Sequence, residues 1–219
     1  MNEKLEDLTK EIVKCEACNL KLGRTQVVPG IYGPKNSLCF VGEAPGYYED
    51  QKGLPFVGRS GKLLDKMLEG IGLAREKDVC ILNVIKCRPT TTEGNNRTPT
   101  ETELRFCGER WLNKQLKLLS PLLVVTLGGI ALKFFNPKVS VTKSAGNILD
   151  SESEYDVFVT YHPAYILRNY NLMEEYNNHF DRIKQIYNQK KKGNFSSKTD
   201  NTEKEVKKKG EQKSITDYF

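Results

Sequence analysis

Residues 37–46 read Ser-Leu-Cys-Phe-Val-Gly-Glu-Ala-Pro-Gly, a short apolar run that stops abruptly at glycine, a charge and proline. Three more apolar runs follow, at residues 79–85, 122–127 and 156–161. Their length and their β-branched residues are typical of strands buried on both faces of a parallel sheet. Segments with the apolar spacing of helices separate them. This alternation predicts a three-layer α/β/α fold, in which a central four-stranded, mostly parallel sheet lies between helices.

The expected helices are marked by apolar periodicity and by capping residues. Residues 3–14 form a predicted amphipathic helix that ends at the first pair of cysteines. Ser60 is the predicted cap of a later helix, and Thr100 with Glu103 has the pattern of a capping box. Apolar residues between 172 and 187 place a last helix on the body. The folded body is therefore expected to span residues 1–187.

The positive charge of the chain is concentrated near its C-terminal end. The sequence of 219 residues has a net charge of +6. Residues 188–213 hold nine Lys against four acidic residues, which leaves the body close to neutral. Such a polar composition does not bury enough apolar surface to fold. Residues 188–211 are therefore a predicted flexible linker, and the charge balance indicates a basic tail rather than a basic groove.

Two features of the sequence bear on its location. No apolar run approaches the roughly 20 residues that a membrane span requires, and the N-terminus does not resemble a signal peptide. We therefore expect a soluble, intracellular protein without a membrane partner.

Six cysteines occur, and in a reducing compartment their spacing indicates metal binding rather than disulfides. Cys39 and Cys80 lie inside apolar runs, which favours buried core thiols. The other four lie outside those runs and are Cys15, Cys18, Cys87 and Cys107. Four thiolates suit either zinc or a [4Fe-4S] cluster, and their spacing alone does not distinguish between these two groups. The third alternative is that the four cysteines bind no metal.

The ends of the four predicted strands carry the residues expected of a binding site. In parallel α/β sheets, ligands bind outside the carboxyl ends of the strands. Those ends are Gly42-Glu-Ala-Pro-Gly46, Asn83 with Lys86-Cys-Arg-Pro89, Gly128-Gly129 and His162-Pro-Ala164. All of them contain polar, glycine or proline residues, which a site requires but which ordinary turns also use.

An ordered set of motifs connects the chain to a known family. Along the chain they are Gly42-Glu-Ala-Pro-Gly46, Glu49-Asp50, Gly53-Leu-Pro-Phe56-Val-Gly-Arg-Ser-Gly61, Asn83-Val-Ile-Lys-Cys87-Arg-Pro89 and His162-Pro-Ala164. With the four cysteines, this set resembles the family 4, iron–sulfur uracil-DNA glycosylases over roughly residues 5–187. The resemblance implies a monofunctional DNA glycosylase that flips uracil out of DNA and hydrolyses its N-glycosidic bond, leaving an abasic site for base excision repair.

The resemblance also implies a cofactor, a partner and a location. By motif position, the ligands of a [4Fe-4S] cluster are Cys15, Cys18, Cys87 and Cys107. The cluster would clamp the N-terminal helix to the loop after the second strand, a structural role rather than a redox one. The partner would be uracil-containing DNA, single- or double-stranded, and the enzyme a cytoplasmic, nucleoid-associated monomer.

A pocket for an extruded base needs a stacking ring and a side chain that reads the edge of the base. Phe56 lies in a Pro-containing loop and is the candidate ring, with a plug of the core as the alternative. The amide of Asn83 offers a donor and an acceptor, and its alternative role is a turn residue at a strand end. By resemblance, Phe56 stacks on uracil, Asn83 reads it, and Glu49 crowds the 5-methyl group of thymine. The backbone that would help to hold the base belongs to Gly42, Glu43 and Ala44.

His162 is one of two histidines and follows the last predicted strand, which Pro163 ends. When the glycosidic bond breaks, negative charge grows on uracil, and an imidazole donor at O2 would stabilise it. The alternative is a capping or core histidine. Glu43 is the candidate to assist the attacking water or the sugar cation, because Ala44 stands where better-known uracil glycosylases carry an aspartate; its alternative role is to hold the loop. His179, on a polar stretch of the last helix, is expected to be solvated.

Contacts to DNA are expected from polar side chains near the site. These are Arg59, Ser60, Lys62, Arg88 and Arg168. Just after the His-Pro-Ala turn, Ile166 or Leu167 is the candidate wedge for the space that the flipped nucleotide leaves. The alternative is that both residues belong to the core at the start of a helix.

The last eight residues carry a second resemblance. The pattern Gln212-x-x-Ile215-x-x-Tyr218-Phe219 resembles the peptide that docks onto a sliding clamp (PCNA), and with an iron–sulfur glycosylase body it looks archaeal. One helical turn would bring Ile215 and the two aromatic rings together as a plug, with Gln212 as a polar anchor. Residues 212–219 are thus a predicted clamp-binding peptide, tethered by the linker while the body searches DNA.

Two other classes of function compete with this interpretation. A non-catalytic module of the same fold would bind DNA and recruit the clamp without releasing uracil. A Rossmann-like enzyme of small molecules would use Gly128-Gly129, but the dinucleotide fingerprint is missing. The stretch from Gly53 to Ser60 also lacks the lysine of a phosphate-binding P-loop, which argues against nucleotide hydrolysis.

Overall fold

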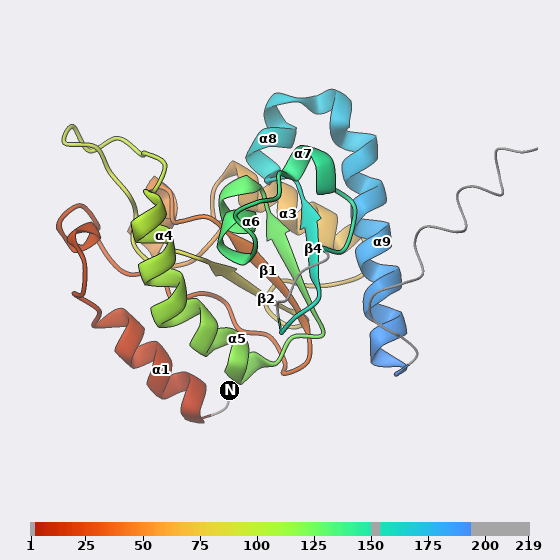
Figure 1. Cartoon of the computed structure of the whole chain (residues 1–219), viewed down its shortest axis with the longest axis horizontal. Coiled ribbons are helices and arrows are strands. Elements are labelled where there is room, and N and C mark those ends of the chain that lie inside the picture. The colour runs from red at the N-terminus through yellow and green to blue at the C-terminus, as the bar shows by residue number, and fades with distance from the viewer. Residues whose placement is uncertain (1–2, 150–153, 194–219) are drawn as a thin grey trace, which may run out of the picture.

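Four parallel strands form the sheet at the centre of the molecule (Figure 1). A computed structural model of the chain describes residues 3–149 and 154–193. The strands are β1 (Leu38–Gly42), β2 (Val79–Asn83), β3 (Leu123–Leu127) and β4 (Val157–Thr160). Their order across the sheet is β2-β1-β3-β4, and every pairing is parallel. The predicted α/β fold with a four-stranded sheet is confirmed.

Helices connect the strands and cover both faces of the sheet (Figure 1). They are α1 (Glu3–Val13), α2 (Tyr47–Lys52), α3 (Arg59–Gly70), α4 (Glu101–Cys107), α5 (Asn113–Leu119), α6 (Gly129–Phe135), α7 (Val141–Ser144), α8 (Pro163–Arg168) and α9 (Met173–Lys191). The other helical elements of the described residues are the 3-10 turns η1 (Asn19–Leu22) and η3 (Tyr170–Leu172) and the π-helical turn η2 (Gly108–Leu112).

The two faces of the sheet carry separate cores, because alternate residues of a strand point to opposite sides. Cys39, Val41 and Cys80 pack with α1, α4, α5 and α6. Phe40 packs on the other face with α3, α8 and α9. Cys39 and Cys80 are fully buried, as the sequence predicted. The helices therefore form outer layers on both sides of the sheet, as expected of an α/β/α sandwich.

The helix caps agree with the sequence at one position and differ at another. Thr100 and Glu103 form the predicted capping box at the start of α4. The prediction that Ser60 caps α3 is wrong, because α3 begins at Arg59 and Gly58 is its cap residue. The Glu49 carboxylate accepts the backbone N–H of Gly58 at 3.2 Å, so a distant side chain does what the glutamate of a capping box would do.

The last helix corrects the prediction for His179. This residue is only 6% exposed, and its Nδ1 lies 2.9 Å from Oγ1 of Thr160. His179 follows the buried Tyr176 by three residues and precedes the buried Ile183 by four, so it lies on the apolar face of α9. Burial lowers the pKa of His179, with a smaller opposing effect from Glu175.

The C-terminal part of the chain is described only up to residue 193. Helix α9 continues through residues 188–191, so the folded body extends beyond the predicted boundary at residue 187. The remainder of the predicted linker and the clamp-binding peptide at 212–219 lie outside the described residues. Among the helices that are described, none combines the length and the apolar character needed to cross a membrane.

The strand order places a crevice at one edge of the sheet. The chain runs from β1 to β2 on one side and returns to place β3 on the other side of β1. The switch point therefore lies between β1 and β3, where the two following loops diverge and leave room for a ligand. Gly42 and Asn83 are paired in register, so the ends of β1 and β2 reach this edge at the same level.

Candidate active site

A cavity of about 380 Å³ opens at the carboxyl edge of the sheet. Its walls come from the loops that follow β1, β2 and β4 and from the start of α3. The lining residues are Glu43, Ala44, Pro45, Gly46, Tyr47, Tyr48, Glu49, Phe56, Gly58, Arg59, Ser60, Asn83, Pro89, Asn96, Arg97 and His162. The cavity thus brings together residues that are separated by more than a hundred positions in the sequence.

Gly42 leaves the space in which two of the predicted pocket residues meet. A Cβ atom at Gly42 would lie 2.5 Å from Oδ1 of Asn83 and 2.6 Å from Cζ of Phe56. Real Cβ atoms do not approach other atoms this closely, so a side chain here would displace the amide, the ring or both. The glycine predicted to help hold a base acts in the structure by letting Asn83 and Phe56 come close to the strand.

Phe56 is fixed in an uncommon backbone conformation. Its φ of 53° is left-handed, and its carbonyl oxygen accepts a hydrogen bond of 2.8 Å from Arg75. Gly61 passes so close that a Cβ there would lie 1.6 Å from the same oxygen. The ring is stacked on that of His162, with centroids 5.7 Å apart, so the two side chains form one aromatic wall. This arrangement supports the stacking role. Phe56 is nevertheless only 6% exposed, so it also contributes to the core.

Asn83 has an acceptor that the protein itself does not satisfy. The residue is 3% exposed, and its Oδ1 is buried without a hydrogen-bond partner in the described part of the chain. Nearly all buried polar atoms in proteins are paired, and leaving one unpaired costs about 1–3 kcal/mol. The backbone oxygen of Asn83 accepts a 2.6 Å hydrogen bond from the buried ammonium group of Lys86, which fixes the strand end. Because Asn83 lines the cavity, a rotation of its amide brings this unpaired acceptor to a ligand there.

His162 caps helix α8 and still presents a nitrogen to the cavity. Its Nδ1 accepts a 3.1 Å hydrogen bond from the backbone N–H of Ala164. Burial, with a smaller contribution from the charge of Arg168, lowers the pKa of His162 to about 4. The ring is therefore neutral at neutral pH, and because Nδ1 accepts, the proton resides on Nε2. The capping role and the predicted donor role are compatible, since they use different nitrogens.

Gly128 explains how His162 can sit so close to the neighbouring strand end. A Cβ at Gly128 would lie 2.9 Å from Cβ of His162, and the φ of 90° favours glycine. The sequence marked this glycine as a strand end and as part of the Gly-Gly pair that a Rossmann-like enzyme would use. The sequence feature that pointed to a role at the site was the position of Gly128 directly after an apolar run, at the edge of the sheet where the site was expected.

Glu43 and Glu49 are the two carboxylates of the cavity, and they differ in their contacts. Oε1 of Glu49 accepts the backbone N–H groups of Val57 and Gly58 at 3.1 and 3.2 Å, so Glu49 fastens the loop that carries Phe56. The Glu43 carboxylate has no hydrogen-bond or ion-pair partner within residues 3–149 and 154–193, and burial raises its pKa. Glu43 is therefore the carboxylate that is free to act on a bound molecule.

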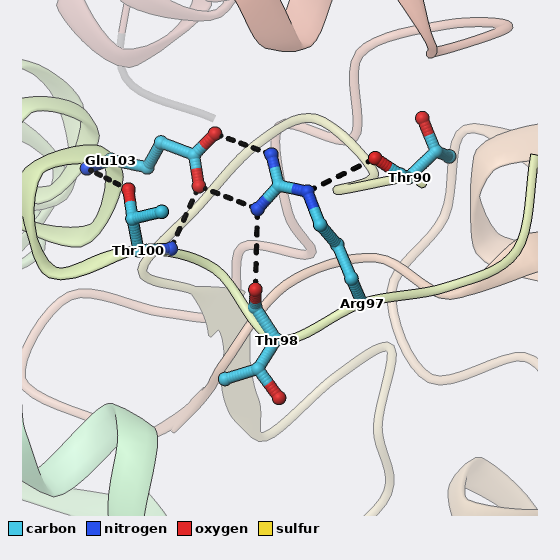
Figure 2. Close-up of polar contacts among 5 residues, drawn as sticks. All are labelled: Thr90, Arg97, Thr98, Thr100 and Glu103. Atoms are coloured by element: carbon cyan, nitrogen blue, oxygen red, sulfur yellow. Dashed lines mark hydrogen bonds and ion pairs between the residues drawn. The ribbon is translucent and has the colours of Figure 1, made fainter. Parts of the chain in front are cut away.

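Arg97 anchors the cavity wall that follows β2, as Figure 2 shows. Its guanidinium donates to both carboxylate oxygens of Glu103, at 2.8 and 2.6 Å, and to the carbonyl oxygens of Thr90 and Thr98. Glu103 in turn completes the capping box with Thr100. The hydrogen bond from Arg97 holds the pKa of Glu103 at about 2, so this anchor persists far into the acidic range.

Asn96 and Arg97 line the cavity but had no signal in the sequence, because their loop has no periodic pattern. The nearest feature in the sequence was the capping box of Thr100 and Glu103, which lie three and six residues after Arg97. Tyr47 and Tyr48 also line the cavity and are 52% and 62% exposed, so they form part of its rim.

Two residues that were predicted to contact DNA are buried instead. Arg88 is 8% exposed, donates to Oδ1 of Asn96 at 2.5 Å and to the carbonyl of Gly94 at 2.9 Å, and lies over the ring of Tyr47. It holds the loop rather than a phosphate. Ile166 is fully buried in the core between α8 and α3 because it lies on the inner face of α8, so it does not act as a wedge.

The other predicted DNA contacts keep an accessible position. Arg59 and Ser60 line the cavity at the start of α3, and Lys62 follows one turn later on the same helix. Arg168 is exposed at the end of α8. Leu167, the alternative wedge, is 37% exposed.

The four cysteines outside the apolar runs gather at one place, where α1 meets the loop after β2 and the end of α4. Burial raises the pKa of Cys87, and the neighbouring Cys18 and Cys15 raise it further. The pKa of Cys107 is raised to about 12, first by burial and then by Cys87 and Cys18. Cys87 is therefore within electrostatic reach of Cys15, Cys18 and Cys107, and Cys18 is within reach of Cys107.

The surroundings of these thiols suit a negatively charged group. Nε1 of Trp111 donates to Sγ of Cys15 at 3.3 Å, and Arg24 donates to Sγ of Cys87 at 3.1 Å. Lys86 is fully buried beside Cys87 and Cys107. Hydrogen bonds to sulfur and a compensating cation are what a cluster of thiolates requires. In the described chain, no three potential ligands form a ready site for a single metal ion.

Comparison with known proteins places these features in a family. Residues 29–186 match the uracil DNA glycosylase superfamily. The chain is 46% identical to a type-4 uracil-DNA glycosylase of Thermotoga maritima over 169 residues, which is 76% of this chain and 85% of the relative. It is 42% identical to the type-4 uracil-DNA glycosylase of Archaeoglobus fulgidus, over 86% of this chain and 96% of the relative. A type-4 uracil-DNA glycosylase of Sulfurisphaera tokodaii is 41% identical over 84% of this chain and 85% of the relative. The chain therefore belongs to the uracil DNA glycosylase superfamily and, within it, to the type-4 uracil-DNA glycosylases.

Proposed function

We propose that this chain is a monofunctional DNA glycosylase that extrudes uracil from DNA and hydrolyses its N-glycosidic bond. The observation that carries the proposal is that Asn83, with its buried and unpaired Oδ1, and the neutral imidazole of His162 line the same cavity. An amide reads the uracil edge, and a neutral Nε2–H donates to O2. In this step the bond between N1 of uracil and C1′ of the sugar breaks, and its electron pair leaves with the base. Water supplies the hydroxyl at C1′, and its other proton neutralises the departing uracil anion.

Each remaining group of the cavity has a role in this reaction. Phe56 stacks on the extruded base, and Glu43 assists the water or stabilises the positive sugar. Glu49 keeps the Phe56 loop in place and limits the space at C5, where thymine carries its methyl group. None of the residues that line the cavity is a lysine, which supports release of the base without cleavage of the DNA strand.

The direct test is the release of free uracil from oligonucleotides by the purified holoprotein. We expect uracil to be released and an alkali-sensitive abasic site to remain, with thymine mismatches left intact. Substrates with hypoxanthine define how far the pocket tolerates other bases. If the protein binds DNA but releases no base from any of them, the chain is a non-catalytic DNA-binding module instead.

The pH dependence of the reaction should report on Glu43. Its pKa is raised by burial above the ordinary value of a carboxyl, and the ionised form is the one that assists the reaction. The single-turnover rate should therefore fall as the pH drops through this raised value. In Glu43→Gln the acid limb should move to lower pH, toward the pKa of about 4 of His162. An acid limb at the same pH in both proteins would contradict the role of Glu43.

We further propose that Cys15, Cys18, Cys87 and Cys107 hold a [4Fe-4S] cluster. The thiol set, the N–H donors to sulfur and the buried Lys86 support this assignment. The group would join α1, the loop after β2 and the end of α4. It would thereby steady Asn83, whose backbone oxygen accepts a hydrogen bond from the ammonium group of Lys86, the residue before Cys87.

Loss of one cluster ligand should bleach and destabilise the protein. Cys87→Ala should remove the brown absorption of the fresh protein and lower its melting temperature, because a structural metal group contributes directly to folding. Cys39→Ala is the matched control, since Cys39 is a buried thiol of the same sheet layer outside the set. It should keep the colour and lose about 2–6 °C from reduced packing. A colourless wild-type protein that contains zinc would contradict the assignment.

The clamp-binding peptide is a separate proposal that rests on residues 212–219. An apolar plug at the end of a polar linker fits a hydrophobic groove on a sliding clamp. Deletion of residues 212–219 should abolish co-elution with the clamp and leave uracil release from short oligonucleotides unchanged. A double substitution of Tyr218 and Phe219 by Ala should have the same effect. Persistent association after the deletion would mean that another surface binds the clamp.

A further inference from the structure

A second hollow lies next to the active-site cavity, and its lining residues belong to α3 and to the segment from α8 to α9. Its volume is about 630 Å³. Arg59 belongs to the walls of both hollows, so one runs into the other at the start of α3. The side chains that matter for its chemistry are Lys62, Lys66, Leu167, Tyr170 and Asn177. We refer to this surface as the α3–α8 groove.

The α3–α8 groove has the charge of a phosphate-binding surface. Arg59, Lys62 and Lys66 follow one another at intervals of three and four residues, so they form a row along one side of α3. The row covers roughly 10 Å of helix. No carboxylate lines the groove, and none of the three cations has an ion-pair partner among the residues that the structure describes. This is notable in a body whose overall charge is close to neutral.

The opposite wall carries an exposed aromatic ring. Tyr170 is 73% exposed, and Leu167 beside it is 37% exposed. Within the described residues the Tyr170 side chain makes no hydrogen bond and no ring contact, and its backbone oxygen accepts the N–H of Met173, so the hydroxyl is unpaired and the ring is open to solvent. Exposed rings next to a row of cations are how proteins bind unpaired nucleic acid, since bases stack on the ring while the cations follow the phosphates.

We propose that the α3–α8 groove binds the single-stranded segment that adjoins the extruded nucleotide. The phosphates of this segment would lie along Arg59, Lys62 and Lys66, and one unpaired base would stack on Tyr170. The proposal rests on the proposed function, because it assigns the flanks of the same substrate. A duplex presents its bases paired and stacked, so Tyr170 favours a segment whose bases are unpaired. Continuity through Arg59 explains how one strand reaches both surfaces.

The proposal predicts a penalty that depends on the length of the substrate. Lys66→Glu and Tyr170→Ala should each raise KM for a long single-stranded oligonucleotide with central uracil by roughly tenfold, with little change in kcat. Both penalties should largely disappear on a trinucleotide with central uracil, which cannot reach the groove. Tyr170→Phe keeps the ring and should bind the long strand far better than Tyr170→Ala. The slope of the logarithm of the binding constant against the logarithm of salt concentration should become smaller by about 1 in the Lys66 variant, which corresponds to the loss of one phosphate contact.

Lys117→Glu is the matched control, since Lys117 is an exposed lysine of α5 on the opposite face of the sheet. It makes the same change of charge and should leave KM for the long strand unchanged. Thermal unfolding shows whether each variant is folded. Equal KM values for wild type and both groove variants on the long strand would overturn the proposal. A penalty seen only with duplex substrates would also overturn it, since the groove would then follow paired DNA.

The failure of this proposal can be told apart from failure of the proposed function. If the wild-type protein releases no uracil from any substrate, the function is wrong. Fluorescence anisotropy with a uracil-free single strand still tests the groove in that case, because the contacts to flanking nucleotides do not require catalysis. Weaker binding by both groove variants than by Lys117→Glu would support the groove, and equal binding would overturn it.

Discussion

Replacement of His162 by Asn is expected to slow uracil release by roughly 10²–10³-fold without loss of the fold. The imidazole has two separate tasks in the structure. Nδ1 accepts the backbone N–H of Ala164 and caps α8, while Nε2 is left for the cavity. Asn is among the best capping residues, so its side-chain oxygen can replace Nδ1. It does not reach the cavity with a donor in the place of Nε2, so only the second task is lost.

The comparison with His162→Ala separates the two tasks. Both variants should lose the same factor in single-turnover rate, but only the Ala variant should also lose the cap, at about 0.5–2 kcal/mol of unfolding free energy. Urea unfolding measures the stability, and excision under enzyme excess measures the rate. An Asn variant with the wild-type rate would show that the imidazole donor has no part in the reaction.

The lowered pKa of His162 adds a prediction about stability. As the pH falls, the unfolded chain takes up a proton at His162 near the ordinary pKa of 6.5, whereas the folded chain takes it up only near pH 4. Its contribution to stability is therefore complete above pH 6.5 and is lost as the pH falls toward 4. The dependence of unfolding free energy on pH should be weaker over this window in His162→Asn than in the wild-type protein.

The sequence could predict the sheet and the edge that carries the site because both depend on local patterns. Each strand is a short apolar run, and in a parallel sheet the ends of such runs meet at one edge. That rule alone brings Glu43, Asn83 and His162 together, and the structure places all three around one cavity. The capping box at Thr100 is likewise a local pattern.

The errors concern the direction in which a side chain points. Arg88 and Ile166 have the residue types of a phosphate contact and a wedge, but their burial depends on the loop and helix that pack around them. The loop with Asn96 and Arg97 has no period, so nothing in the sequence placed it beside the cavity. His179 differs, because its spacing from Tyr176 and Ile183 already put it on the apolar face of α9. Its polar neighbours concealed a periodicity that was present.

Asn83→Ala is the second substitution with a large expected effect, and it should uncouple activity from stability. Without the amide, uracil loses the group that recognises its edge, and the rate of excision should fall by roughly 10²–10³-fold. A purely structural asparagine at a strand end would behave differently, since its removal would break contacts and lower the unfolding free energy. In this protein Oδ1 is buried without a partner, so the folded state already bears the cost of desolvating it.

Thr160 provides the matched control for this argument. It ends β4 as Asn83 ends β2, it is equally buried, and its hydroxyl is paired with Nδ1 of His179 at 2.9 Å. Thr160→Val should therefore lower the unfolding free energy by about 1–3 kcal/mol, because Nδ1 of His179 is left unpaired. Asn83→Ala should leave it unchanged or raise it, since removal of the unpaired acceptor offsets the lost packing. If urea unfolding shows Asn83→Ala to be the less stable of the two, the amide serves the fold. If Asn83→Ala is the more stable and the less active of the two variants, then the protein keeps the unpaired Oδ1 of Asn83 because only the substrate pairs with it.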